Sequence, residues 1–435
     1  MATLTGLISA VSEPSGLWAI IIKAFENGVG SYILAVLLLT IIIRVVWAPV
    51  DTLNKKSSKK MMRNQAKIQP QMEKLEKQYA KDPNLLNRKK QELYKKANAG
   101  LGGGCLFMII FMALNLTIFG TMFTTMNAFS SYKVYDNYEV MKDSYANVLN
   151  IVDSTDDTTM EDIVKNYKDV KVVVEKNKIS LVNKADSSVV YATGDYVTKF
   201  ETKKSKKDNK TTYKETKIAA LINKYVTDDK DTTTEFIGGK TVTINGKEVR
   251  YSTAIQAIAT NYTNSVYEEQ QKETSFLWVG NIWVADSPFK QSVLDFKAYR
   301  EMVGGDNVAT NEEFIYNSFM KTIKDKYNTT NGYFILAVIS VGITYLSMLF
   351  SNGIKKKKTA QPEVKQNKAM MIIMPLIMGV FAIMYNSVFA FYLVASQAIN
   401  VLLTPLENLI IDKWEARDIK KEEEKNAVEY SRKKI

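Results

Sequence analysis

Histidine is absent from this chain of 435 residues, and cysteine occurs once, at Cys105. Without imidazole the chain lacks the commonest metal ligand and the usual general base near neutral pH, which argues against metalloenzymes and serine–histidine hydrolases. A single cysteine excludes an intramolecular disulfide. Because Cys105 stands at the start of an apolar block, we expect it to pack as a small hydrophobe rather than to act as a redox or lipid-anchor site. We therefore expect no catalytic residue, no cofactor and no metal site.

A phosphate-binding loop is also missing, because Gly102-Gly103-Gly104 is not followed by Lys-Ser or Lys-Thr. The charge is distributed unevenly. Residues 51–100 hold 14 basic and 5 acidic side chains, and residues 354–369 hold 6 and 1, whereas residues 128–330 are nearly neutral with 28 and 30. Basic excess in two short loops is typical of a membrane protein that follows the positive-inside rule, and not of a uniformly basic nucleic-acid-binding protein.

Long apolar runs alternate with these charged stretches, and about 20 apolar residues in a helix cross a bilayer. The first candidate spans are 31–50, broken only by Arg44, then 103–126 and 332–350. The apolar run from Ala369 to Ile411 is too long for one span and divides at Tyr385-Asn386-Ser387. Five spans are predicted, and the lysines that follow the first and third spans indicate that both of those loops are cytoplasmic. The N-terminus and residues 128–330 are then outside, and the C-terminus is cytoplasmic.

Two further helical segments are predicted at the membrane surface. Residues 17–26 separate charged from apolar positions, as expected for an interfacial helix, although they also fit a frayed approach to the first span. Residues 52–97 contain no glycine, and Ile68, Met72, Leu75 and Tyr79 have the spacing of a coiled-coil seam. Because the sequence at 81–84 interrupts that pattern, we expect two antiparallel helices. Their basic face either binds ribosomal RNA or anionic lipid headgroups, or is only solvated.

Arg44 is the main candidate for a functional residue, since it lies about 9 Å inside the first span at 1.5 Å per residue. A charge at such a depth costs on the order of 2–3 kcal/mol. Either its side chain reaches back to the inner surface, or it faces a water-filled cavity between helices. Polar residues in other spans could line such a cavity, although each also fits ordinary contacts between helices. These candidates are Asn115, Thr117, Tyr392, Ser396, Gln397 and Asn400.

Several blocks, in the same order along the chain, resemble the YidC family of membrane-protein insertases. They are LLLTIIIRVVWAP (37–49), the hairpin block KIQPQMEKLEKQYAKDPNLLNRKKQELYKKANAGLGGGCL (67–106), SFLWVGNIWVADSPF (275–289), MPLIMGVF (374–381) and FYLVASQAINVLL (391–403). With the order of spans around them they cover about half of the chain, and the hairpin block is the most specific.

The resemblance implies an α-helical polytopic membrane protein with a five-helix insertase core, a cytoplasmic helical hairpin and an extracytoplasmic α+β or β insertion. It also implies a positively charged groove, open to the cytoplasm and the lipid, in which Arg44 receives acidic residues of a client's hydrophilic tail. The implied partners are nascent membrane proteins, the ribosome and targeting factors through the hairpin and tail, a Sec translocon, and the lipid bilayer of a bacterial cell membrane. No nucleotide is implied.

The chain departs from the family in its second span, where Phe107, Phe111 and Ala113 replace the usual prolines and glutamine. Asn115, one turn further on, is the candidate substitute for the glutamine. About 145 additional residues separate Phe129 from the FLW block. Within them we expect short strands at 170–174, 179–182 and 189–192, a lysine-rich loop at 203–214, and a hairpin at 241–251 with Asn245-Gly246 as its turn.

The predicted organisation has ten segments. Residues 1–30 form an extracytoplasmic N-terminus with the interfacial helix, 51–102 the cytoplasmic coiled-coil hairpin, 127–331 the extracytoplasmic domain, 351–368 a cytoplasmic loop and 412–435 a charged cytoplasmic tail. The spans are 31–50, 103–126, 332–350, 369–385 and 388–411. A transporter or channel that uses Arg44 is the alternative function, although no internal repeat is evident. A surface receptor would explain the insertion but not a polar groove.

Overall fold

The computed structural model describes residues 11–97, 104–197, 202–204, 211–213, 215–226, 240–305, 312–351 and 368–432. The chain divides into two compact units. The helical unit comprises Gly16–Thr125 and the residues from Phe334 onward, and the mixed unit comprises Met126–Tyr333 with the residues before Gly16. The Asn115 and Arg44 regions belong to the helical unit, so the candidate site lies within one of the two units.

The helical unit is built from helices that begin or end with recognisable signals. Asp82 caps the second hairpin helix, since its carboxylate accepts from the Leu85 amide at 3.0 Å and Pro83 occupies the first helical position. Gly30, with φ of 71°, ends the first helix in the left-handed conformation. The described helices of this unit are α1 (Leu17–Val29), α2 (Tyr32–Gln78), α3 (Pro83–Lys96), the first part of α4 (Gly104–Asp153), α10 (Ile335–Ser351), α11 (Lys368–Met384) and α12 (Ser387–Arg432).

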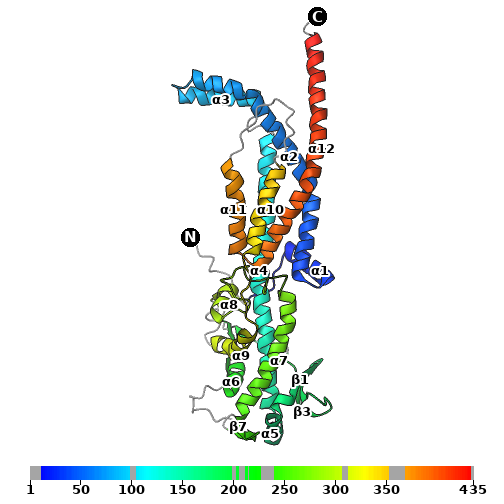
Figure 1. The fold of residues 1–435 in the computed structure, drawn as a ribbon, viewed down its shortest axis with the longest axis vertical. Coiled ribbons are helices and arrows are strands. Elements are labelled where there is room, and N and C mark those ends of the chain that lie inside the picture. Colours follow the sequence, from blue (N-terminus) through cyan, green and yellow to red (C-terminus); the bar gives the residue numbers. More distant parts are fainter. Residues whose placement is uncertain are drawn as a thin grey trace. The chain divides into compact units, whose positions relative to one another are not determined.

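Two of these helices pass through the boundaries that we expected between spans and cytoplasmic segments. The 47-residue α2 includes both the first apolar run and the first half of the hairpin, with Pro49 and Pro70 inside it. The 46-residue α12 likewise continues through Pro405 into the charged tail. The second half of the hairpin, α3, folds back along the end of α2 (Figure 1), where Lys90 and Glu76 form an ion pair of 2.6 Å.

Packing in the helical unit centres on α12, which contacts α10 and α2, while α10 also contacts α11. Three described helices are long and apolar enough to cross a membrane: Tyr32–Gln78, Ile109–Asp153 and Ser387–Lys421. Ile335–Phe350 and Met371–Met384 are shorter apolar helices. Many large apolar side chains on these helices are exposed, among them Val338, Ile372 and Leu402. Exposed apolar surface of this extent is expected on helices that face lipid.

The mixed unit combines helices with three small antiparallel sheets, of order β1-β2-β3, β4-β5 and β6-β7. Its described elements are the later part of α4, α5 (Asp157–Lys165), a short 3-10 helix (Tyr167–Asp169), β1 (Val170–Glu175), β2 (Lys178–Asn183), β3 (Val190–Asp195), β4 (Thr202–Lys204), β5 (Thr211–Tyr213), α6 (Glu215–Tyr225), β6 (Thr241–Ile244), β7 (Lys247–Arg250), α7 (Tyr251–Thr274), α8 (Phe296–Val303) and α9 (Glu312–Tyr327).

The strands of this unit fall where the alternating apolar residues indicated. Asn245 and Gly246 both have positive φ, at 50° and 74°, as a two-residue type I′ turn between β6 and β7 requires. The interpretation of 203–214 as an exposed loop was wrong in part, because β4 and β5 pair across it. The rest of that loop lies outside the described residues.

The FLW block belongs to the same compact unit as the inserted residues before it, because that unit extends to Tyr333. Asn331 explains this, because its buried side chain accepts from the Asn281 amide at 2.6 Å and donates to the carbonyls of Asn281, Val284 and Ala285. Buried backbone groups need such partners, so one amide side chain holds the block in place.

Gly332 leaves no room for a side chain beside this cluster. A Cβ at position 332 would lie 1.8 Å from Asp286 Oδ1 and 3.1 Å from Asp286 Cα, while the same carboxylate oxygen accepts from the Tyr333 amide at 2.8 Å. We expect Gly332→Ala to lower the unfolding free energy of the mixed unit by about 3 kcal/mol, as overpacking does. Thermal unfolding of the full chain in detergent micelles measures this. Gly342→Ala in α10, with open space around its Cβ, is the matched control and should leave the transition unchanged.

Candidate functional site

Arg44 on α2 lies against α12. Its Nε donates to Ser396 Oγ at 2.8 Å, and its Nη2 donates to the same oxygen. Ser396 is only 2% exposed, whereas Arg44 is half-buried. Among the residues that the structure describes, no carboxylate forms an ion pair with Arg44. A guanidinium held by one hydroxyl keeps most of its five N–H donors for another acceptor.

Tyr392, one turn before Ser396 on α12, is buried. Its ring belongs to an aromatic cluster that joins α12 to α4, with centroid distances of 6.3 Å to Phe119 and 6.0 Å to Phe389. Phe123 completes the contact, 4.7 Å from Phe389. This aromatic packing holds α12 against α4 one to two turns before Ser396.

The remaining predicted residues divide into two groups. Gln397 and Asn400 lie on α12 and are partly exposed, and the Asn400 carbonyl accepts from Thr404. Asn115 Nδ2 instead donates to the Phe111 carbonyl at 2.8 Å, and Thr117 Oγ1 donates to the Ala113 carbonyl at 2.9 Å. The structure thus brings Ser396 to Arg44, with Tyr392 one turn away on the same helix, whereas the two polar groups of α4 bond to their own helix.

A second polar contact lies further along the same pair of helices. Lys55 forms an ion pair with Glu407 and lies 3.4 Å from Thr404 Oγ1. Glu407 is 5% exposed, and the lysine offsets the cost of burying its carboxylate. Asp51, one turn before Lys55, is half-buried. Burial raises the pKa of the Asp51 carboxyl, Arg44 and Lys55 oppose that rise, and Glu407 adds to it. We call Arg44, Lys55, Ser396, Thr404 and Glu407 the polar seam.

The register of the seam is constant. Arg44 and Ser396, and also Lys55 and Glu407, are 352 residues apart, and Lys59 and Asp412 are 353 apart. A nearly constant offset over residues 44–59 means that these stretches of α2 and α12 run in the same direction alongside each other, whereas in Figure 1 the two helices cross in the view and diverge beyond this stretch. The contacts therefore form one continuous interface rather than isolated pairs.

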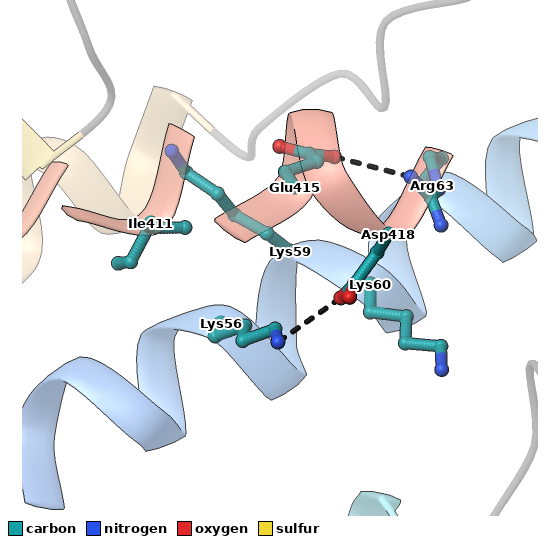
Figure 2. A pocket seen from close by; sticks show the side chains of 7 residues that line it. All are labelled: Lys56, Lys59, Lys60, Arg63, Ile411, Glu415 and Asp418. Carbon is teal, nitrogen blue, oxygen red and sulfur yellow. Dashed lines mark ion pairs between the residues drawn. The ribbon is translucent and has the colours of Figure 1, made fainter. Parts of the chain in front are cut away.

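The interface ends in a small surface hollow. Figure 2 shows Lys56 and Arg63 of α2 turned toward Asp418 and Glu415 of α12, with ion-pair distances of 3.0 and 3.5 Å. The hydrogen bond and charge of Lys56 hold the pKa of the Asp418 carboxyl below its usual range. Lys56, Lys59, Lys60, Arg63, Ile411, Glu415 and Asp418 line the hollow.

These ion pairs bear on the basic face predicted for the hairpin. Four of the five basic residues that directly follow the first span each pair with a carboxylate of α12: Lys55, Lys56, Lys59 and Arg63. An anionic partner would have to compete with α12 for this part of the face. Sequence reasoning missed the pairing, although the signal was present, since acidic residues at 407, 412, 415 and 418 recur on α12 at spacings of five, three and three.

Comparison with known proteins identifies relatives over part of the chain. Residues 24–174 match the family model described as 60Kd inner membrane protein. The membrane protein insertase YidC of Fusobacterium nucleatum is 30% identical over 104 residues, which are 24% of this chain and 49% of that protein. The YidC insertase of Geobacter sulfurreducens is 36% identical over 20% of this chain and 16% of its own length. That of Caldanaerobacter subterraneus is 32% identical over 26% of this chain and 52% of its own length.

The chain thus spans about half the length, or less, of the curated relatives that it matches. No solved structure matches it. The match from residue 24 includes Arg44, all of α2 and α3 and the start of the mixed unit. Together with the apolar helices, these similarities identify a multi-pass membrane protein, and over part of its length the chain is similar to the YidC family of membrane-protein insertases.

Proposed function

We propose that this protein is a membrane-protein insertase and folding chaperone, and not an enzyme. Its core would consist of five spans: the apolar parts of α2, α4 and α12, with α10 and α11. The hydrophilic tail of a nascent membrane protein would pass along the side of the core on which Arg44 lies. The observation that carries this proposal is the half-buried Arg44 held by the Ser396 hydroxyl, within a chain similar to the YidC family.

The chemistry of this surface suits a transient contact. Arg44 offers N–H donors to a client carboxylate without first having to release a carboxylate of its own, and Gln397 and Asn400 add amide groups nearby on α12. A charge-assisted hydrogen bond to Arg44 is worth about 1.5–3 kcal/mol, which is enough to hold a tail and weak enough to release it.

Insertion itself would be driven by the client's apolar segment. Moving it from water into lipid gains roughly 25 cal/mol per Å² of apolar surface, so no nucleotide has to be consumed by this chain. The polar surface would shorten the path that the hydrophilic tail must cross in hydrocarbon, where unsatisfied polar groups are costly.

The orientation follows from the basic loops. With the lysines after the first and third spans in the cytoplasm, the hairpin α2–α3 and the end of α12 would face the ribosome, targeting factors or a Sec translocon. The N-terminus and most of the mixed unit would lie outside the cell membrane. Lys90 and Glu76, which tie α3 to α2, would keep the hairpin in a defined shape for such a partner.

Depletion and rescue tests the proposal. A bacterial strain depleted of its own insertase receives this chain, and insertion of a short single-span client with an acidic external tail is followed by protease protection. We expect the intact chain to restore insertion to at least about half of the normal level. If it is expressed in the predicted topology and restores nothing, the insertase proposal fails and a transporter that uses Arg44 becomes the better explanation.

A further inference from the structure

The polar seam contains two cations in different electrostatic states. Arg44 bonds to a hydroxyl group, whereas Lys55, eleven residues further along α2, is paired with Glu407. Eleven residues of helix correspond to about 17 Å. In the proposed topology Lys55 lies nearer the cytoplasm, so a client tail that moves from the cytoplasm toward Arg44 would meet the Lys55–Glu407 pair first.

Glu407 differs from the other carboxylates of α12 that pair with α2. Its side chain is 6% exposed, whereas that of Asp412, which pairs with Lys59, is 65% exposed. Water and salt screen the exposed Lys59–Asp412 pair strongly, and such exposed ion pairs contribute little to the stability of a protein. The field of Glu407 is screened much less, so this carboxylate acts on any charged group that approaches Lys55.

The charged groups around this position balance. Arg44 and Lys55 supply two positive charges, and Glu407 and Asp51 are the two carboxyl groups that act on the same region. An acidic client residue would therefore find Lys55 already neutralised by Glu407. It could bind Lys55 only by taking the place of Glu407, an exchange of one carboxylate for another that brings no net gain.

We propose that Glu407 acts as a charge filter at the cytoplasmic mouth of the polar seam: by neutralising Lys55 it keeps this lysine from attracting carboxylates, and so limits how acidic a client's translocated tail can be. The proposal rests on the insertase function proposed above and names its substrate class: membrane proteins whose translocated tails are hydrophilic but carry few carboxylates. Thr404, 3.4 Å from Lys55 Nζ, helps to hold the lysine in place when a client carboxylate approaches.

The test uses the full chain in the depleted strain with three clients that differ only in the external tail, which carries no charge, two Asp or two Lys. Glu407→Gln removes the neutralising charge and frees Lys55. We expect insertion of the Asp client, relative to the uncharged client, to rise about threefold to tenfold, and insertion of the Lys client to fall by a similar factor.

Two further variants make the result specific. Asp412→Asn removes one carboxylate from the exposed Lys59 pair and should leave the ratios between clients unchanged. Lys55→Gln alone leaves a buried carboxylate without its partner and endangers folding, so the double variant Lys55→Gln/Glu407→Gln is used. With both charges gone, we expect ratios within about twofold of those of the intact chain.

The outcomes are separable. Equal shifts for Glu407→Gln and Asp412→Asn, or no shift for either, would overturn the filter while leaving the insertase function intact. Loss of insertion of all three clients by the unaltered chain would instead refute the function on which the filter rests.

Discussion

Replacing Arg44 by alanine is expected to reduce insertion of a client with an acidic external tail at least about tenfold in the depleted strain. A tenfold change corresponds to about 1.4 kcal/mol, the lower end of what a hydrogen bond to a charged group contributes. The same change should lower insertion of a client with an uncharged tail less than about twofold, because such a tail has no carboxylate for the guanidinium. Protease protection of both tails, with the variant's amount checked by immunoblot, provides the ratio.

Three matched variants define the role of the arginine. Arg44→Lys keeps the charge but cannot donate through both Nε and Nη2 to Ser396, so we expect an intermediate loss. Ser396→Ala frees the guanidinium and tests positioning alone. Arg63→Ala, on the same helix but paired with Glu415, should leave the client ratio unchanged. Full activity of Arg44→Ala on the acidic client would show that Arg44 only reaches back to the membrane surface.

Lys142→Met is expected to lower the unfolding free energy of the mixed unit by about 3–5 kcal/mol, the cost of breaking a buried ion pair. The Lys142 side chain is 2% exposed and lies between two carboxylates, pairing with Glu139 on α4 and with Glu312 on α9 at 3.2 Å. Burial favours the neutral amine, but these carboxylates raise the pKa of Lys142 above its usual range, so the ammonium is charged. Its removal leaves two negative charges in the core beside Tyr138.

The pH dependence of unfolding of Lys142→Met distinguishes the loss of the ion pair from the loss of packing. Burial and the charge of Glu312 raise the pKa of Glu139 in the folded state, and in the variant Lys142 no longer opposes that rise, so the pKa lies further above that in the unfolded chain. Folding then takes up protons, so the deficit should be largest above the raised value and shrink as the pH falls through it. Thermal unfolding of the full chain in detergent micelles at several pH values measures this. Lys142→Met/Glu312→Gln is the control, and a deficit in the single variant that does not change with pH would point to lost packing instead.

Much of the helical unit follows from local sequence. Apolar runs of about 20 residues, the Asp82-Pro83 helix start and the break at Tyr385-Asn386 depend only on neighbouring residues, and the structure has helices, a cap and a break at those places. The strands around residues 170–195 and the Asn245-Gly246 turn are local signals too. The five-span topology itself stays a prediction.

The helices of the mixed unit were not predicted, and the reason is physical. Its core depends on distant partners, such as Tyr138, whose hydroxyl donates to Glu312 at 2.5 Å across 174 residues. A lysine such as Lys142 would be assigned to the surface from sequence alone, because lysine is rarely buried without a partner. Its burial is possible here because two carboxylates pair with it, Glu139 nearby in the sequence and Glu312 far away. Nothing short of the tertiary structure identifies those pairs.

The sequence alone determined where the chain is apolar enough to span a membrane, where the basic loops lie, and that Arg44 is a charge within an apolar segment, because these are properties of short windows. The tertiary structure decided which polar residues meet Arg44. It selected Ser396 over Asn115 and Thr117, since the packing of α2 against α12 brings together residues 352 positions apart, while the polar groups of α4 satisfy their own backbone. Periodicity shows which face of a helix is polar, but only packing decides which other helix that face meets.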